Sequence, residues 1–213
     1  MHTRHRASPL QVRVAKQLAQ ERQLENQAVN GYPEKLHLGC ARRFIPGFYH
    51  VDAQAYPHVD RVADVSDLSF LPDNTVTLIY ASSVLEHFGR HEYMDVLAEW
   101  YRVLKKGGVL RLSVPDFDAA VAVYLDRERF PDGLRRIHGA LIGGQRDRWD
   151  FHKMVFNAQL LTESLMQTGF RTCRHWDWRK TEHSHVDDYS QAYQPHMDKT
   201  NGIHQALNLE GVK

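Results

Sequence analysis

The chain has 213 residues, of which 42% are hydrophobic and 25% charged, so it can bury a full core and form one domain. Its 27 basic and 26 acidic residues give a formal net charge of +1, which argues against nucleic-acid or membrane binding through bulk charge. The two cysteines, Cys40 and Cys173, exclude a disulfide framework and a four-cysteine zinc site. No apolar run reaches the length of a signal peptide or a membrane span. We therefore expect a cytoplasmic protein with no nucleic-acid partner and no membrane insertion.

The first 34 residues predict a helical arm. Ser8-Pro9-Leu10-Gln11 combines an N-cap residue, a proline at the first helical position and a glutamine placed for a capping box. The helix should run to about Ala28, and the turn residues Asn30-Gly31-Tyr32-Pro33 should end it. Residues 1–34 are thus expected to form an arm beside a main domain of residues 35–213.

Short apolar runs bounded by turns begin at Lys35: KLHLGC, FYHVDA, RVADV, VTLIYAS and VLRLSV. Runs of this kind are typical of strands buried on both faces of a parallel sheet. Between the fourth and fifth runs, Met94, Leu97, Tyr101 and Leu104 recur at helical spacing, and Gly107 suits a helix cap. This order predicts an α/β fold, although the first two connections are too short for full helices.

The second half of the chain predicts a helix-rich stretch over residues 118–170, including AQLLTESLMQTGF, which ends on Gly169 as a helix should. A strand is expected near residues 172–176, and a final strand in HQALNLEGVK. The large aromatic side chains of this half are expected in the core: Phe117, Tyr124, Trp149, Trp176 and Trp178.

The stretch LHLGCARRFIPGFYHVD places Gly39 directly after an apolar strand and Asp52 thirteen residues later, at the end of the next one. In a nucleotide-binding α/β unit, such a loop approaches the ligand and such an acid binds a ribose. The segment GCARR argues against NAD, because a dinucleotide fold needs further glycines to admit the pyrophosphate.

Together with ADVSDLSFLPDNTVTLIYASSVLEHF and EWYRVLKKGGVLRLSVPDF, residues 35–117 resemble the class I S-adenosylmethionine-dependent methyltransferases, specifically their type 11-like bacterial group. The likeness extends more loosely through GGQRDRWDFHKMVF, TGF and LNLEGVK. It implies a Rossmann-like, seven-stranded, mostly parallel sheet whose last strand is antiparallel. It also implies S-adenosyl-L-methionine as cofactor, lying across the carboxyl ends of the first strands. Residues 118–170 would then cover the substrate.

The resemblance implies that Gly39, Cys40 and Ala41 approach the methionine part of the cofactor. Read without it, Gly39 is an ordinary turn glycine and Cys40 a small buried filler, since thiols bury readily.

By the same resemblance, Asp52 would hold the ribose hydroxyls, Asp64 and Val65 would border the adenine, and Ser82 would face the methionine end. The chemistry is suitable, because a carboxylate can accept two hydrogen bonds from a vicinal diol or one from an adenine amino group.

The expected reaction is methyl transfer to a small-molecule or glycan acceptor, at oxygen in preference to other atoms. A neutral hydroxyl must lose its proton, and a histidine near the acceptor can take it. His152 is the first candidate base, with Asp150 able to orient it, and His87 is the second. Either histidine could instead be structural.

Two other functions stay open. A methyltransferase-like binding module without turnover would explain the glycine-poor loop. A metal-dependent hydrolase would use HSHVDD, residues 183–188, whose histidines and aspartates are good ligands for a divalent metal. Because Asp188 stands where the hydrolase signature has a histidine, and because the segment lies late in the chain, we expect no metal site.

Overall fold

The computed structural model describes residues 31–213, so all but the last four residues of the predicted N-terminal arm lie outside the described part. The strands are β1 (Lys35–Leu38), β2 (Tyr49–Asp52), β3 (Arg61–Val62), β4 (Val76–Ser82), β5 (Leu104–Pro115), β6 (Thr172–His175), β7 (Tyr193–Gln194), β8 (Ile203–His204) and β9 (Ala206–Val212). The α-helices are α2 (Tyr93–Val103), α3 (Phe117–Leu125), α4 (Leu134–Ile142) and α5 (Ala158–Thr168). Three short 3₁₀ helices are η1 (Leu85–His87), η2 (Trp178–Lys180) and η3 (Tyr189–Gln191).

Seven strands form one sheet in the order β3-β2-β1-β4-β5-β9-β6. The pairs among β1 to β5 are parallel, whereas β9 runs antiparallel to both β5 and β6. The predicted Rossmann-like sheet with an antiparallel last strand is therefore confirmed. Strands β7 and β8 pair separately as a small antiparallel ribbon.

The early connections are short, as predicted. Within the described residues, no α-helix lies between β1 and β4, and loops and turns fill the connections instead. The loops that follow β1, β2 and β3 therefore lie at the carboxyl ends of these strands without a helix of their own.

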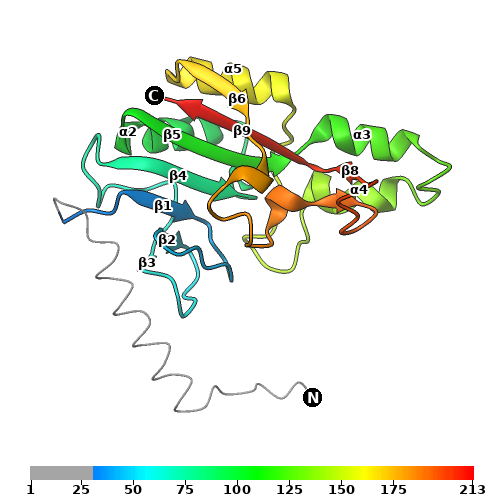
Figure 1. Cartoon of the computed structure of the whole chain (residues 1–213), viewed down its shortest axis with the longest axis horizontal. Helices are drawn as coiled ribbons and strands as arrows, with labels where there is room; N and C mark the ends of the chain where they lie inside the picture. Colours follow the sequence, from blue (N-terminus) through cyan, green and yellow to red (C-terminus); the bar gives the residue numbers. More distant parts are fainter. Residues whose placement is uncertain (1–30) are drawn as a thin grey trace, which may run out of the picture.

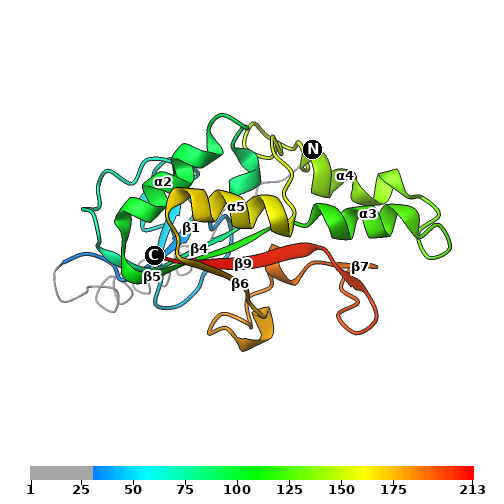
Figure 2. The same ribbon diagram turned by 90° about the horizontal axis from the view of Figure 1, so that it is seen from above.

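Helices α2 and α5 cover one face of the sheet, as Figures 1 and 2 show from two directions. Trp100 of α2 is fully buried there, in the same apolar cluster as Ile79 and Ala81 of β4. Because side chains alternate along a strand, Tyr80 lies on the opposite face, where it joins Phe48 in a smaller cluster. The segment after β6 runs along this second face (Figure 2).

The junction between α2 and β5 differs from the expectation that Gly107 caps the helix. Helix α2 ends at Val103, and Leu104 already pairs with Val76 as the first residue of β5. Gly107 (φ +79°) lies inside β5, where its N–H donates to the carbonyl of Lys213 at 2.9 Å. The prediction was wrong because pairing with neighbouring strands extended the backbone before the local glycine signal could act.

Helix α5 ends as predicted. Gly169 adopts the left-handed conformation (φ +118°), and its N–H donates to the carbonyls of Leu165 and Met166. At the other end, the Asn157 side chain accepts the N–H of Leu160.

Helices α3 and α4 lie side by side beyond the carboxyl end of β5 (Figures 1 and 2). Phe117, Tyr124 and Trp149 are exposed at 40%, 37% and 41%, so the expectation that they lie in the core was wrong. Phe117 and Tyr124 lie on α3, which projects from the sheet and buries only one side, whereas Trp149 lies in the loop after α4. Among the described helices, none is both long and apolar enough to cross a bilayer.

Candidate active site

A cavity of about 1640 Å³ opens at the carboxyl ends of the parallel strands. Its wall includes Gly39 after β1, Asp52 at the end of β2, Asp64 after β3 and Ser82 at the end of β4. This is the edge of an open α/β sheet where ligands bind, because the strand ends and their loops converge there. The sheet thus brings together residues that lie far apart in the sequence.

Position 39 requires a glycine, both because of its backbone conformation and because Val84 lies close to it. Its φ is +61°, and an added Cβ would lie 2.5 Å from Cγ2 of Val84. Its N–H donates to the carbonyl of Val51 at 2.8 Å, which ties the loop to β2. The loop therefore passes closer to the segment after β4 than any other residue type would allow.

Asp52 organises the loop beside it. Its Oδ2 accepts the N–H of Ala41 at 2.7 Å, and its Oδ1 accepts the N–H of Gln54 at 2.8 Å. Ala41 has a positive φ of +46°, so this hydrogen bond holds it in a conformation that alanine rarely adopts. Each carboxylate oxygen keeps a second acceptor site, and the residue lines the cavity.

Asp64 and Val65 form the neighbouring part of the wall. The Oδ1 of Asp64 accepts from both the N–H and the hydroxyl of Ser66, at 2.9 and 2.7 Å. The carbonyl of Val65 accepts the indole N–H of Trp100 at 2.8 Å, which links this segment to helix α2.

Ser82 and Cys40 contribute differently. The hydroxyl of Ser82 is buried and has no hydrogen-bond partner within the described residues, which is costly unless a ligand supplies one. Cys40 is buried, and burial, with a smaller contribution from the charge of Asp52, raises the pKa of its thiol. The thiol therefore stays protonated and acts as a small apolar group in the cavity wall.

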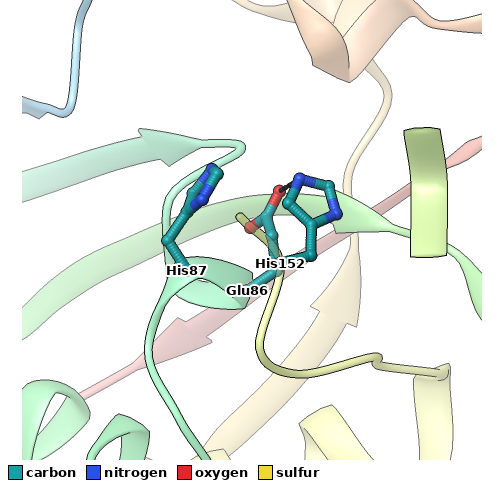
Figure 3. Close-up of side chains that lie close together, drawn as sticks. All are labelled: Glu86, His87 and His152. Atoms are coloured by element: carbon teal, nitrogen blue, oxygen red, sulfur yellow. Dashed lines mark ion pairs between the residues drawn. The ribbon is translucent and has the colours of Figure 1, made fainter. Parts of the chain in front are cut away.

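Glu86, His87 and His152 come together beside the same cavity (Figure 3). Glu86 is fully buried, and the side chain of His152 is 6% exposed. The Nε2 of His152 lies 3.9 Å from Oε1 of Glu86, and the two imidazole rings pack edge to face with centroids 4.8 Å apart. His87 lines the cavity, whereas His152 is not among the described residues of its lining.

Backbone hydrogen bonds bring this cluster together across a long stretch of sequence. The carbonyl of Glu86 accepts the N–H groups of Lys153 and Met154 at 2.8 and 3.1 Å. The Nδ1 of His87 lies 3.0 Å from the carbonyl oxygen of Phe151, and the backbone N–H of His152 donates to the carbonyl oxygen of Ile142. The segment 151–154 is thus fixed against η1.

Burial controls the protonation of the cluster. It raises the pKa of Glu86 to about 7, and it lowers the pKa of His152. Burial and then the neighbouring charge of His152 lower the pKa of His87. The expectation that Asp150 orients His152 was wrong, because the Asp150 carboxylate pairs with Arg146 at 2.6 Å while Nδ1 of His152 faces the carbonyl of Ala140.

The segment HSHVDD does not form a site within the described residues. His183 is buried with its ring 4.1 Å from that of Tyr80, whereas His185 and Asp187 are exposed. Asp188 accepts hydrogen bonds from Tyr80 and Ser190. The ligand candidates therefore point in different directions, and the reading of this segment as a hydrolase centre loses its basis.

Two further residues of this cluster, Glu86 and Ser83, were not predicted from the sequence. The hydroxyl of Ser83 donates to Oε1 of Glu86 at 2.7 Å, and Ser83 has a positive φ of +58°. The sequence did contain one indication of Glu86. Burying a carboxylate within the apolar segment VLEHF costs free energy, so an acid at this position suggests a function.

The donor set fits S-adenosyl-L-methionine. Asp52 offers carboxylate oxygens for a ribose diol, and Ser82 offers an unpartnered buried hydroxyl in the same wall. The position of Gly39 lets the backbone come close to a ligand, because a Cβ there would fill the space.

Comparison with known proteins agrees with this geometry. A family model described as "Methyltransferase domain" matches residues 44–112. No curated protein matches the sequence.

Several solved structures share the fold. A SAM-dependent methyltransferase from Archaeoglobus fulgidus is 14% identical with a TM-score of 0.51, over 95% of this chain and 94% of that one. A SAM-dependent methyltransferase from Thermotoga maritima, described as a possible histamine N-methyltransferase, is 16% identical with a TM-score of 0.50, over 95% and 97%. The 1,6-didemethyltoxoflavin-N1-methyltransferase of Burkholderia thailandensis, solved with 1,6-didemethyltoxoflavin and S-adenosylhomocysteine, is 13% identical with a TM-score of 0.52, over 100% and 93%.

At these identities the structural likeness concerns the fold, while the matched domain covers β2 to β5, which contribute Asp52, Asp64 and Ser82 to the cavity. The sequence motifs, the fold and the domain match agree. Residues 44–112 match a methyltransferase domain, and the chain has the fold of solved S-adenosylmethionine-dependent methyltransferases.

Proposed function

We propose that this chain is a class I S-adenosylmethionine-dependent methyltransferase that methylates a hydroxyl group of a small-molecule or glycan acceptor. When bound, S-adenosyl-L-methionine supplies an activated methyl group for in-line displacement. The chain's own residues then have to hold the cofactor, align the acceptor oxygen, exclude water and deal with the hydroxyl proton.

The proposed cofactor contacts are those inferred from the resemblance: Gly39, Cys40, Ala41, Asp52, Asp64, Val65 and Ser82. Their common position in the cavity wall supports this assignment. Asp52 would accept from the ribose hydroxyls, and Ser82 would face the methionine end, where its buried hydroxyl would gain a partner.

The observation that carries the hydroxyl assignment is the Glu86–His87–His152 cluster at the cavity wall (Figure 3). A neutral hydroxyl is a poor nucleophile until its proton is removed or its pKa lowered. We place the acceptor oxygen next to His87, which lines the cavity, and His152 behind it. His152, the first candidate base from the sequence, would thus influence the acceptor through its contacts with Glu86 and His87, without touching the acceptor itself.

The size of the cavity supports an acceptor of some bulk. Its volume of about 1640 Å³ exceeds the ~300–1,000 Å³ of a usual ligand pocket, so cofactor and acceptor can be accommodated together. Tyr56 and Trp149 contribute aromatic surface to its lining. Such faces suit a sugar or another ring.

The test is transfer of radiolabelled methyl from S-adenosyl-L-methionine to a panel of sugars, glycans, phenols and amines, with the methylated atom located by mass spectrometry. We expect label on oxygen. Two similar structures carry names that specify methylation at nitrogen, so the amines are the informative comparison. Label on nitrogen alone, with no hydroxyl acceptor used, would refute the proposal.

We also propose that the enzyme acts in the cytoplasm without a nucleic-acid partner. Both cysteines are free thiols, which suits a reducing compartment. Cell fractionation with an antibody against the native protein would check the location, and a polynucleotide-binding assay the absence of that partner.

A further inference from the structure

We propose that Glu86, His87 and His152 bind a divalent transition-series cation at the wall of the methyltransferase cavity. The cation would take the acceptor's hydroxyl oxygen as a further ligand. Only this second part rests on the proposed function.

The donor atoms already lie together. One ligand atom from each of the three residues lies within 4.8 Å of the others. Ligands about 2.1 Å from one ion lie no more than about 4.2 Å apart, so the side chains would move closer together on binding. Figure 3 shows the Glu86 carboxylate and the His152 ring facing each other, with the His87 ring beside them. Two imidazoles and one carboxylate form a ligand set that suits zinc, iron, cobalt, nickel or manganese, and suits magnesium poorly.

Each of the two histidines makes a hydrogen bond through Nδ1, which affects which ring nitrogen can bind a cation. Nδ1 of His87 faces the carbonyl of Phe151, and Nδ1 of His152 faces that of Ala140, each at 3.0 Å. A carbonyl oxygen can only accept, so Nδ1 of each ring carries a hydrogen, and Nε2 of His152 keeps a lone pair toward Glu86. His87 also interacts with the backbone of Ser83, so its ring would have to give up that contact to bind a cation through its second nitrogen. Metal-binding histidines are oriented by this kind of second hydrogen bond.

Glu86 gives an independent indication of a missing ligand. It is fully buried, and its Oε2 has no hydrogen-bond partner within the described residues. Its Oε1 is held by the hydroxyl of Ser83 at 2.7 Å. A buried carboxylate oxygen without a partner is rare and destabilising, whereas a cation between Glu86 and the histidines would satisfy it.

The surrounding structure favours a cation. Ser83 adopts a left-handed conformation (φ +58°), and such strain gathers at functional sites. Lys153 follows His152 directly, but its Nζ lies 3.8 Å from the Glu92 carboxylate, so its charge is paired with a group outside the cluster.

The site has open positions on the substrate side. Three protein ligands leave coordination positions free, as in catalytic metal sites, and His87 brings the cluster to the cavity. A coordinated hydroxyl has a lowered pKa. The O–H bond of this hydroxyl would break with the proton passing to water, the O–CH₃ bond would form as the S–CH₃ bond of the cofactor breaks, and the electron pair would stay on sulfur.

This site replaces the expectation of no metal, which weighed only the segment 183–188. It also gives His87 and His152 a shared role in the reaction, as ligands.

The experiment uses the full chain, stripped of metal by a chelator and then titrated with Co²⁺, Zn²⁺ or Mn²⁺. For Co²⁺ we expect one ion per chain and a visible absorption band from nitrogen and oxygen ligands. The variants Glu86→Gln, His87→Ala and His152→Ala should each weaken binding by about 100-fold or more, since even residues behind the ligands cost ~10–100-fold. His91→Ala is the matched control, because His91 is exposed and lies four residues beyond His87, and it should bind as the wild type does.

Glu86→Gln keeps the size of the side chain and removes a buried charge, so it should fold even if a histidine variant does not. Thermal unfolding of the wild type should shift upward with Co²⁺, and that of Glu86→Gln should not. The inference is overturned if the wild type binds none of the three ions at millimolar concentration, or if Glu86→Gln binds them as tightly. Hydroxyl methylation at full rate by the stripped protein would overturn the cation's role as a ligand of the acceptor while leaving the proposed function intact. Metal binding combined with methylation of nitrogen alone would support the site and refute the hydroxyl acceptor.

Discussion

At the scale of single residues, the loop after β1 depends on two unusual positions. Gly39 has no room for a Cβ, and Ala41 holds a positive φ only with the help of the Asp52 carboxylate. The loop and the acid are therefore one unit, and a change in either should reach the cofactor.

Asp52→Ala should weaken binding of S-adenosyl-L-methionine by about 100-fold or more, because two charge-assisted hydrogen bonds to the ribose are worth roughly 1.5–3 kcal/mol each. The loss of the Ala41 and Gln54 contacts adds to the effect. Calorimetry measures the affinity, and Asp118→Ala, an exposed aspartate outside the cavity lining, is the control. Unchanged affinity in a folded Asp52→Ala protein would place the ribose elsewhere.

Gly39→Ala should lower both stability and cofactor affinity, because the new methyl group would lie 2.5 Å from Val84. Gly47→Ala is a matched control, since Gly47 also has a positive φ (+79°) but has nothing within 4 Å of the added Cβ. Gly47→Ala should lower the free energy of unfolding only by the backbone strain, ~1–2 kcal/mol. Urea unfolding of both variants measures the difference, and equal losses would mean that the contact with Val84 is unimportant.

At the scale of elements, helix α2 supports the adenine side of the proposed cofactor site. Trp100 is fully buried and donates to the carbonyl of Val65 at 2.8 Å. Glu99 accepts the N–H of Leu68 at 2.9 Å, and Arg102 donates to the carbonyls of Leu68 and Leu71. One turn of α2 thus holds the whole segment that follows β3, which has no helix of its own.

Trp100→Phe should destabilise the protein by roughly 2–4 kcal/mol, through an unpaired buried carbonyl and a partly empty site. Cofactor affinity should also fall, because Val65 loses its support. Urea unfolding and calorimetry measure the two effects. Trp178→Phe is the control, since Trp178 is only half-buried and its N–H makes a long 3.4 Å bond to Tyr193. Wild-type cofactor affinity in the Trp100→Phe protein would show that α2 does not support the cofactor site.

At the scale of the whole molecule, the face of the sheet opposite α2 and α5 is lined by buried histidines. His37 and His50 are on β1 and β2, and His183 packs against Tyr80 from the segment after β6. Burial lowers the pKa of His183 to about 4 and lowers the pKa of His37. This face should therefore be the acid-sensitive part of the fold.

His183 should make folding sensitive to acid. Its pKa is lower in the folded than in the unfolded state, so the unfolded chain binds the proton first, and stability falls as pH drops from about 6.5 toward 4. His183→Phe keeps an aromatic ring beside Tyr80 and should remove up to roughly 3 kcal/mol of that loss.

Urea unfolding at several pH values measures the effect, and His185→Ala, at an exposed neighbour, should leave the pH profile unchanged. A profile for His183→Phe identical to that of the wild type would show that His183 does not contribute.

Much of the fold followed from local sequence. The apolar runs from Lys35 onward marked the strands, because a strand buried on both faces cannot contain polar residues without partners. Gly169 marked the end of α5 because only glycine adopts the left-handed cap easily. Gly39 and Asp52 marked the cavity because the carboxyl ends of parallel strands meet at one edge.

Tertiary structure decided what depended on distant partners. Gly107 lies within β5 because it pairs with Lys213, more than 100 residues away in the sequence. Asp150 forms an ion pair with Arg146 and not with His152. Glu86 lies beside His152 because the N–H groups of residues 153 and 154 donate to the carbonyl of Glu86. Local sequence thus determined where most strands, the end of α5 and the loop after β1 lie. Only the closure of long loops onto the sheet decided which polar side chains share one buried environment, because that depends on contacts between residues that local pattern does not relate.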